Sequence, residues 1–286
     1  KRLLSLSIAL SFAIASMAQI DGDYRTKTSG IWGEAGTWEI YNVDTWEDAT
    51  SPPIPVGMLI DNTITIQAGH IVTLTATGTQ LFFPKLTIEN SGDLFISGTA
   101  TFEHYSAVTI DGIFVTSATV NVDIATGSMT INTTGLVTIG GSLTNSGTSG
   151  VDGLIIKSDE NNTGSLIHGS GTPAATVERA VPISSWHFVA PSTTGVTPQN
   201  FYIDEDNAAW LTKWDESAGD WEYFVDPLTD PLPLGSGYSY WWEDSPAKEM
   251  TTPGTVEFKG NLLNPDGTYS VSLTTTGTGE TAGFNL

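Results

Sequence analysis

The sequence predicts an all-β protein in which a right-handed parallel β-helix, or β-solenoid, is followed by an antiparallel β-sandwich-like domain. Two observations carry this prediction. Short apolar strands recur at a nearly constant interval through the first half of the chain. Tryptophan is absent from residues 59–185 but occurs six times in residues 186–242. The polar residues are mainly Thr, Ser, Gly and Asn, which favour strands and turns over helices.

The repeat is a short strand in which polar and apolar residues alternate. Five copies align on their last isoleucine: Ile66, Ile88, Ile110, Ile131 and Ile156. The intervals are 22, 22, 21 and 25 residues, a length that fits one coil of a three-faced β-helix. One copy cannot bury its apolar row alone, whereas stacked copies bury a continuous column. An antiparallel sandwich is the alternative, because short and evenly spaced strands are typical of that fold too.

Each isoleucine is followed by a short polar turn and a second apolar pair. These pairs are Val72/Leu74, Leu94/Ile96, Ile113/Val115, Val137/Ile139 and Leu166/Ile167. Side chains of a strand alternate between its two faces, so Phe95 and Phe114 are expected to lie outside on neighbouring coils. The same alternation predicts an outward threonine column, which leaves an ice- or mineral-binding face as a minor alternative. This column contains Thr65, Thr87, Thr109 and Thr130.

We divide the chain into four segments. Residues 1–18 have a basic start, an apolar run and small residues before Gln19, which predicts a secretory signal peptide. Residues 19–58, with three tryptophans and a proline-rich end, are expected to cap the solenoid, because its terminal strands need cover. The solenoid is expected over residues 59–172 and the antiparallel domain over residues 173–286, where it is cut short.

Charge and cysteine content narrow the function classes. The chain has 32 acidic and 10 basic residues, for a net charge of −22. Such a surface repels nucleic acid and anionic membranes. The sequence contains no cysteine, so an exported chain of this kind has no disulfides. No second apolar run reaches the length of a membrane span.

The residues do not predict catalysis. A lyase needs a base, yet residues 59–167 contain no arginine and only two lysines, Lys85 and Lys157. A glycosidase needs two neighbouring carboxylates, and the best pair, Glu89 with Asp111, is better explained as solvated turn residues. We therefore expect a non-catalytic structural or adhesive module. The alternative is part of a polysaccharide-active enzyme, a lyase or glycosidase, whose catalytic part is cryptic or lies downstream.

Two groups of residues are candidates for ligand binding. The tryptophans of the second domain are candidates for stacking on a surface polysaccharide or another extracellular polymer: Trp214, Trp221, Trp241 and Trp242. Trp241 and Trp242 are adjacent on an expected strand, so only one of them can face the core. Asp204, Asp206 and Asn207 form the densest oxygen cluster and are candidates for binding Ca²⁺; no other cofactor is expected.

Several phrases resemble a known class of protein. They are Tyr24–Trp32 (YRTKTSGIW), Gly36–Glu39 (GTWE), Ile64–Ile66 with Ala68–His70, Ala175–Arg179 (ATVER) and Trp186–Val189 (WHFV). They are similar to large Bacteroidetes surface proteins that are exported by the type IX system and carry a C-terminal sorting domain. The resemblance implies a secreted or outer-cell-surface location. It also implies that residues 282–286 continue into a further strand, so that this chain is a fragment at both ends.

Overall fold

The computed structural model describes residues 19–53, 61–77, 81–83, 85–181, 185–201, 211–224, 231–241, 254–265 and 267. Over this range the protein is all-β, as predicted. Its helical elements there are three short 3-10 turns: η1 (Ala35–Thr37), η2 (Gly150–Gly153) and η3 (Pro198–Asn200). The predicted signal peptide lies outside the described residues.

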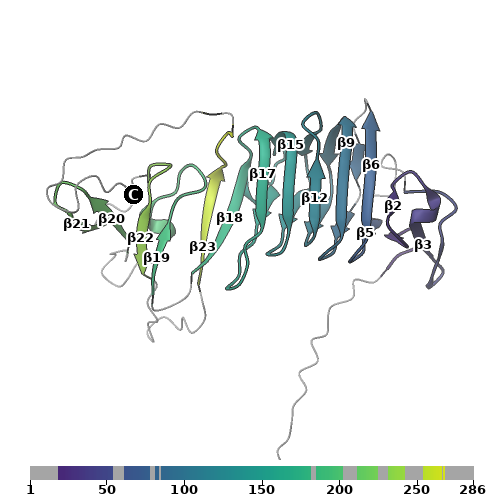
Figure 1. Ribbon diagram of the computed structural model, residues 1–286, viewed down its shortest axis with the longest axis horizontal. Helices are drawn as coiled ribbons and strands as arrows, with labels where there is room; N and C mark the ends of the chain where they lie inside the picture. Colours follow the sequence, from purple (N-terminus) through teal and green to yellow (C-terminus); the bar gives the residue numbers. More distant parts are fainter. Residues whose placement is uncertain are drawn as a thin grey trace, which may run out of the picture.

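The first half is a β-solenoid of about five turns with three parallel faces, which we call sheets A, B and C (Figure 1). Sheet A contains β5 (Thr63–Ile66), β8 (Lys85–Ile88), β11 (Ala107–Ile110), β14 (Ser128–Ile131), β16 (Leu154–Ile156) and β18 (Ala174–Val181). Sheet B contains β6 (Ile71–Thr77), β9 (Asp93–Thr99), β12 (Ile113–Thr116), the first half of β15 (Leu136–Thr144) and β17 (Ser165–Ser170). Sheet C contains β7 (Leu81–Phe83), β10 (Thr101–His104), β13 (Asn121–Ile124) and the second half of β15.

The repeat alignment on isoleucine is confirmed. The five isoleucines pair rung to rung in sheet A, and each is at most 6% exposed. A second buried column runs beside them: Ile64, Leu86, Val108, Met129 and Leu154. Burial of each such side chain contributes about 1.5–3 kcal/mol. The threonine column is confirmed as well, with Thr65, Thr87, Thr109 and Thr130 in register on the outer side of sheet A.

The predicted inward pair Ile113/Val115 is wrong by one residue. Phe114 stacks on Leu94 and is fully buried, and Thr116 also lies inside. Ile113, Phe114 and Val115 are all apolar, so the sequence does not show which of them faces inward. The turn before them is also shorter than its counterparts. Only Asp111 and Gly112 join β11 to β12, and a Cβ atom on Gly112 would lie 2.0 Å from the Gly92 carbonyl oxygen.

The predicted outward ladder of Phe95 and Phe114 is therefore wrong, although Phe95 itself is 36% exposed. The pair Leu166/Ile167 is also misassigned. His168 stacks on Ile139 and is buried, whereas Ile167 faces solvent. Both segments contain consecutive apolar residues, so the sequence does not show which of their side chains face inward.

The N-terminal segment closes the first turn of the solenoid. β1 (Tyr24–Thr26) adds to sheet A beside β5, and β2 (Gly30–Ile31) adds to sheet B beside β6. β3 (Trp38–Asn42) and β4 (Thr45–Asp48) then continue sheet A as antiparallel strands. Trp32 and Trp38 lie buried with their rings 4.8 Å apart, and the Trp38 indole N–H donates to the Trp32 carbonyl oxygen at 2.8 Å.

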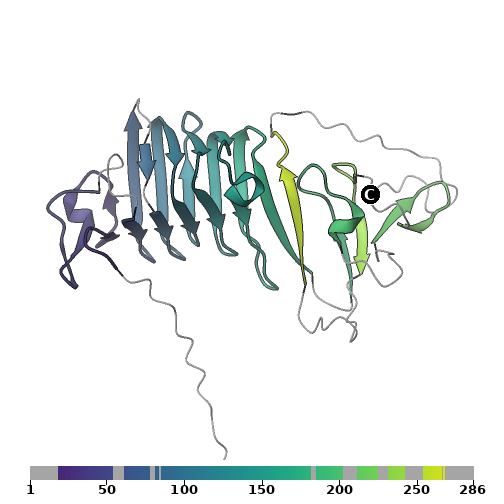
Figure 2. The same cartoon turned by 180° about the vertical axis from the view of Figure 1, so that it is seen from behind.

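At the other end, the solenoid runs directly into the second domain. β18 is parallel to β16 but antiparallel to β23 (Gly254–Asn261), so the strand that follows residue 173 belongs to sheet A. A separate antiparallel sheet contains β19 (Trp186–Val189), β22 (Tyr238–Trp241), β20 (Leu211–Asp215) and β21 (Asp220–Tyr223) in that order (Figure 2). A second apolar core joins this sheet to β18 and β23: it includes Val181, Val189, Leu211, Tyr238, Tyr240, Val256 and Phe258.

The buried column makes a direct prediction for stability. Ile110→Asp places a charge inside the solenoid and should lower the free energy of unfolding by more than about 3 kcal/mol. Thr109→Asp, one residue away on the outer side, should cost less than about 1 kcal/mol. Urea unfolding of both variants checks this. Equal losses would contradict the register of sheet A.

His104 predicts a pH dependence of stability. It is fully buried on β10, and desolvation lowers its pKa from 6.5 to about 4, although Asp123 acts in the opposite direction. Between these two values the unfolded chain binds a proton that the folded chain does not. This group's stabilisation is therefore complete above pH 6.5 and is lost as pH falls towards 4, by about 3 kcal/mol in total. The slope of unfolding free energy against pH reports the number of protons taken up on unfolding. In this window His104→Leu should lower that number by about one. An unchanged slope would contradict the assignment.

Candidate binding groove

The outer face of the four-stranded sheet carries an array of aromatic side chains. Cross-strand register places Trp186 beside Trp241, and Trp214 beside Trp221. In the next row Phe188, Ser239, Thr212 and Tyr223 lie side by side across all four strands. Aromatic residues from all four strands therefore border a short polar strip, which is formed by Ser239 and Thr212.

Strand alternation explains why these residues face outward. Tyr238 and Tyr240 of β22 are buried, and the Tyr240 ring contacts Phe201 at 4.9 Å between centroids. The residues between and after them, Ser239 and Trp241, must then face the opposite side. The core contact of Tyr240 thus fixes which side of the sheet carries the aromatic array.

These residues form a groove of about 470 Å³. It is lined by Trp186, Phe188, Thr212, Asp220, Trp221, Tyr223 and Ser239. Trp186, Phe188 and Tyr223 are 48%, 73% and 50% exposed, unusually high values for rings of this size. The Phe188 and Trp221 rings are 6.2 Å apart, so they form one continuous wall.

The floor of the groove is polar and internally bonded. Thr212 and Ser239 are almost fully buried, and the Thr212 hydroxyl donates to the Ser239 carbonyl oxygen at 3.2 Å. Asp220 supplies the carboxylate among the lining residues, and its Oδ1 accepts the Trp221 N–H at 2.8 Å. Flat, solvated rings around a polar strip suit a ligand with both apolar faces and hydroxyl groups.

The second acid of the same hairpin, Asp215, lies opposite Asp220 in register. Its pKa is lowered, chiefly by the Ser217 hydroxyl and then by the N–H groups of Ala218 and Ser217. Asp215 therefore holds the turn between β20 and β21. Lys213, the cation of this hairpin, pairs with Glu222 at 3.0 Å.

Three of the four candidate tryptophans lie on this face. Trp221 lines the groove, Trp214 packs against it at 5.5 Å, and Trp241 packs behind Trp186 at 5.6 Å. Trp242 lies outside the described residues. Sequence reasoning missed Trp186, Phe188 and Tyr223, the most exposed rings of the groove. The alternation of Trp186 and Phe188 around His187 was the available signal.

The candidate Ca²⁺ ligands Asp204, Asp206 and Asn207 all lie outside the described residues. Within the described ranges, no group of three or more His, Asp or Glu side chains is arranged to hold a metal ion. The carboxylate pair considered for glycoside hydrolysis has structural contacts instead. The Asn132 side-chain amide donates to both carboxylate oxygens of Asp111, at 2.9 and 3.0 Å. The Glu89 carboxylate accepts the Ala68 N–H.

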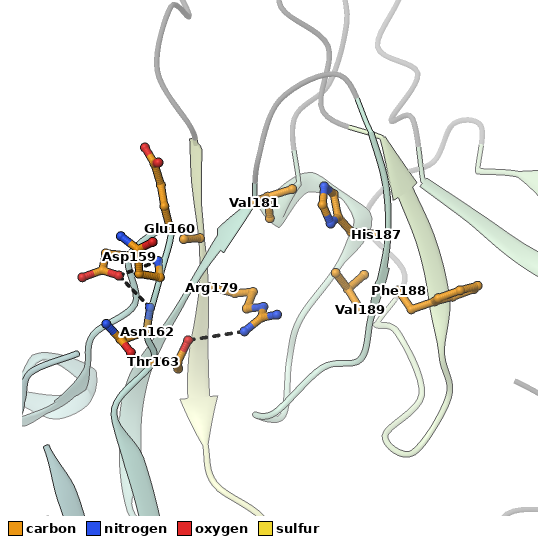
Figure 3. Close-up of a pocket in the computed structure, with 11 residues that line it drawn as sticks. Asp159, Glu160, Asn162, Thr163, Arg179, Val181, His187, Phe188 and Val189 are labelled. Atoms are coloured by element: carbon orange, nitrogen blue, oxygen red, sulfur yellow. Dashed lines mark hydrogen bonds between the residues drawn. The ribbon is translucent and has the colours of Figure 1, made fainter. Parts of the chain in front are cut away.

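A second cavity, of about 440 Å³, lies between the turn at residues 159–163 and strands β18 and β19 (Figure 3). Arg179 points toward Thr163 and donates to its hydroxyl at 3.3 Å, whereas Glu160 points away. Asp159 accepts the N–H groups of Asn161 and Asn162, which lower its pKa. Asp159 therefore holds this turn in place, whereas His187 of β19 is hydrogen-bonded through Nε2 to the Ser185 hydroxyl at 2.7 Å.

The outer surface of sheet B is largely apolar, which is unusual for a protein with a net charge of −22. Ile31, Ile71, Phe95, Leu136 and Ile167 are between 36% and 63% exposed along two adjacent columns. Asp93 is the one charged residue within these columns, and burial raises its pKa. The outer side of sheet A carries Thr65, Thr87 and Lys85 at similar positions.

Comparison with known proteins adds no family assignment. No family model matches the chain, no curated protein matches it, and no solved structure matches it with statistical significance. Among the described residues, none of the helical elements has the length and apolar character needed to cross a bilayer.

The two faces of the four-stranded sheet predict opposite effects of aromatic truncation. Phe188→Ser removes a solvated ring and should change the free energy of unfolding by less than about 1 kcal/mol. Tyr240→Ser removes a fully buried ring and should cost about 3–5 kcal/mol. Thermal and urea unfolding check both. A large loss for Phe188→Ser would mean that the groove residues belong to a core.

Proposed function

We propose that this chain is a non-catalytic structural and adhesive module of a secreted or cell-surface protein, and that its terminal sheet binds glycan. The observation that carries the proposal is the groove of exposed Trp186, Phe188 and Tyr223 around a polar floor. Pyranose rings have apolar faces that stack on aromatic side chains and hydroxyl groups at their edges. The groove offers partners for both.

The solenoid gives this groove a rigid support. Its sheet A continues through β18 into β23, which carries part of the core beneath the four-stranded sheet. A rigid stalk with a binding face at one end suits attachment at a surface. The signal-peptide pattern and the resemblance to type IX-exported surface proteins support an extracellular location for it.

The alternative of a polysaccharide-active enzyme has less support. The Glu89 and Asp111 carboxylates are engaged in hydrogen bonds that join neighbouring turns of the solenoid. Among the described residues that line the groove, Asp220 is the one carboxylate, whereas the usual glycosidase mechanism needs two. We therefore expect binding without turnover.

Calorimetric titration of the purified chain with glycan oligomers, chosen from an array screen, tests the proposal. We expect a dissociation constant roughly between 0.1 and 10 mM, because few rings contribute and each contributes modestly. Phe188→Ala and Trp186→Ala should weaken binding at least about fivefold with unchanged melting temperatures.

Phe95→Ala is the matched control, since Phe95 is also a partly exposed ring but lies on sheet B. The Phe95→Ala variant should bind the glycan with the same affinity as the wild type. Absence of binding to every glycan, or equal loss for Phe95→Ala, would refute the groove as the site. Release of shortened oligomers by the wild type would favour the enzyme.

A further inference from the structure

The groove has a distinct charge as well as an aromatic wall. Among the described residues that line it there is no lysine, arginine or histidine, and Asp220 lies at the end of the strand that carries Trp221 and Tyr223. The nearest cation on the same hairpin, Lys213, is paired with Glu222. The chain as a whole carries a net charge of −22. A ligand in this groove therefore experiences a negative potential.

Aromatic faces add a second preference for positive charge. The π-systems of Trp, Tyr and Phe attract cations placed over the ring. The Phe188 and Trp221 rings are 6.2 Å apart, Asp220 lines the same groove, and its Oδ1 accepts the Trp221 backbone N–H. A groove lined by a carboxylate and several exposed rings is an arrangement that recognises an organic ammonium group.

Building on the proposed function, we propose that the groove selects glycans that carry free amino groups, with the ammonium group bound between Asp220 and the rings of Trp221 and Phe188. The sugar ring itself stacks on the remaining aromatic surface. Neutral glycans keep the stacking contacts and lose the charge contacts. Uronic-acid glycans bring a carboxylate toward Asp220 and are repelled.

The experiment compares four oligomers of equal length with the full chain: glucosamine, N-acetylglucosamine, glucose and glucuronate. Titrations are run at low and high salt, at a pH where the amine is protonated. We expect glucosamine to bind about three- to tenfold tighter than the glucose oligomer at low salt, with glucuronate the weakest. The preference for the amine should shrink at high salt, because screening weakens exposed charge pairs.

Asp220→Asn removes the negative charge but keeps a side-chain oxygen that can accept the Trp221 N–H, so the local fold should be retained. This variant should lose most of the preference for glucosamine over glucose oligomers, and the rings of Trp221 and Phe188 should retain the remainder. Glu47→Gln removes the same charge from β4, at the far end of the solenoid (Figure 1), and should retain the full preference.

The outcomes separate this inference from the proposed function. Equal binding of glucosamine and glucose oligomers by the wild type overturns the amine preference and leaves the glycan site standing. Tighter binding of glucuronate overturns it too, as does an amine preference that Asp220→Asn leaves undiminished. Absence of binding to all four oligomers contradicts both proposals together.

Discussion

The stacking of inward aliphatic side chains from one turn of the solenoid to the next is the interaction on which the rest of the structure depends. Ile66, Ile88, Ile110 and Ile131 touch no solvent and pair in parallel register. The column can form only if every turn keeps the same strand in the same place. That requirement fixes the three sheets and leaves the outer side chains free to vary.

The strands that cover the two ends of the column determine which surfaces remain open for binding. The hairpin of β3 and β4 covers one end, and the antiparallel strand β23 covers the edge of sheet A at the other. β23 also buries Val256 and Phe258 against the four-stranded sheet. Because one face of that sheet is needed for this core, its other face can carry exposed aromatic rings without loss of stability.

Much of the fold could be predicted because sheet A repeats one pattern at a steady interval. Phe114 could not be placed, since its neighbours Ile113 and Val115 are also apolar and the segment has no polar–apolar alternation. The groove was predictable only in part. Trp214, Trp221 and Trp241 were identified by type, but the face they occupy depends on the contact of Tyr240 with Phe201, two residues that are distant in sequence.

Hydrogen–deuterium exchange of the full chain, with and without a saturating glucosamine oligomer, tests the central claim most directly. A rigid solenoid that presents a preformed groove predicts added protection in β19 and β21, which carry the lining aromatics, and unchanged exchange throughout sheets A, B and C. Protection centred on the outer side of the solenoid, with β19 and β21 unaffected, would contradict the account.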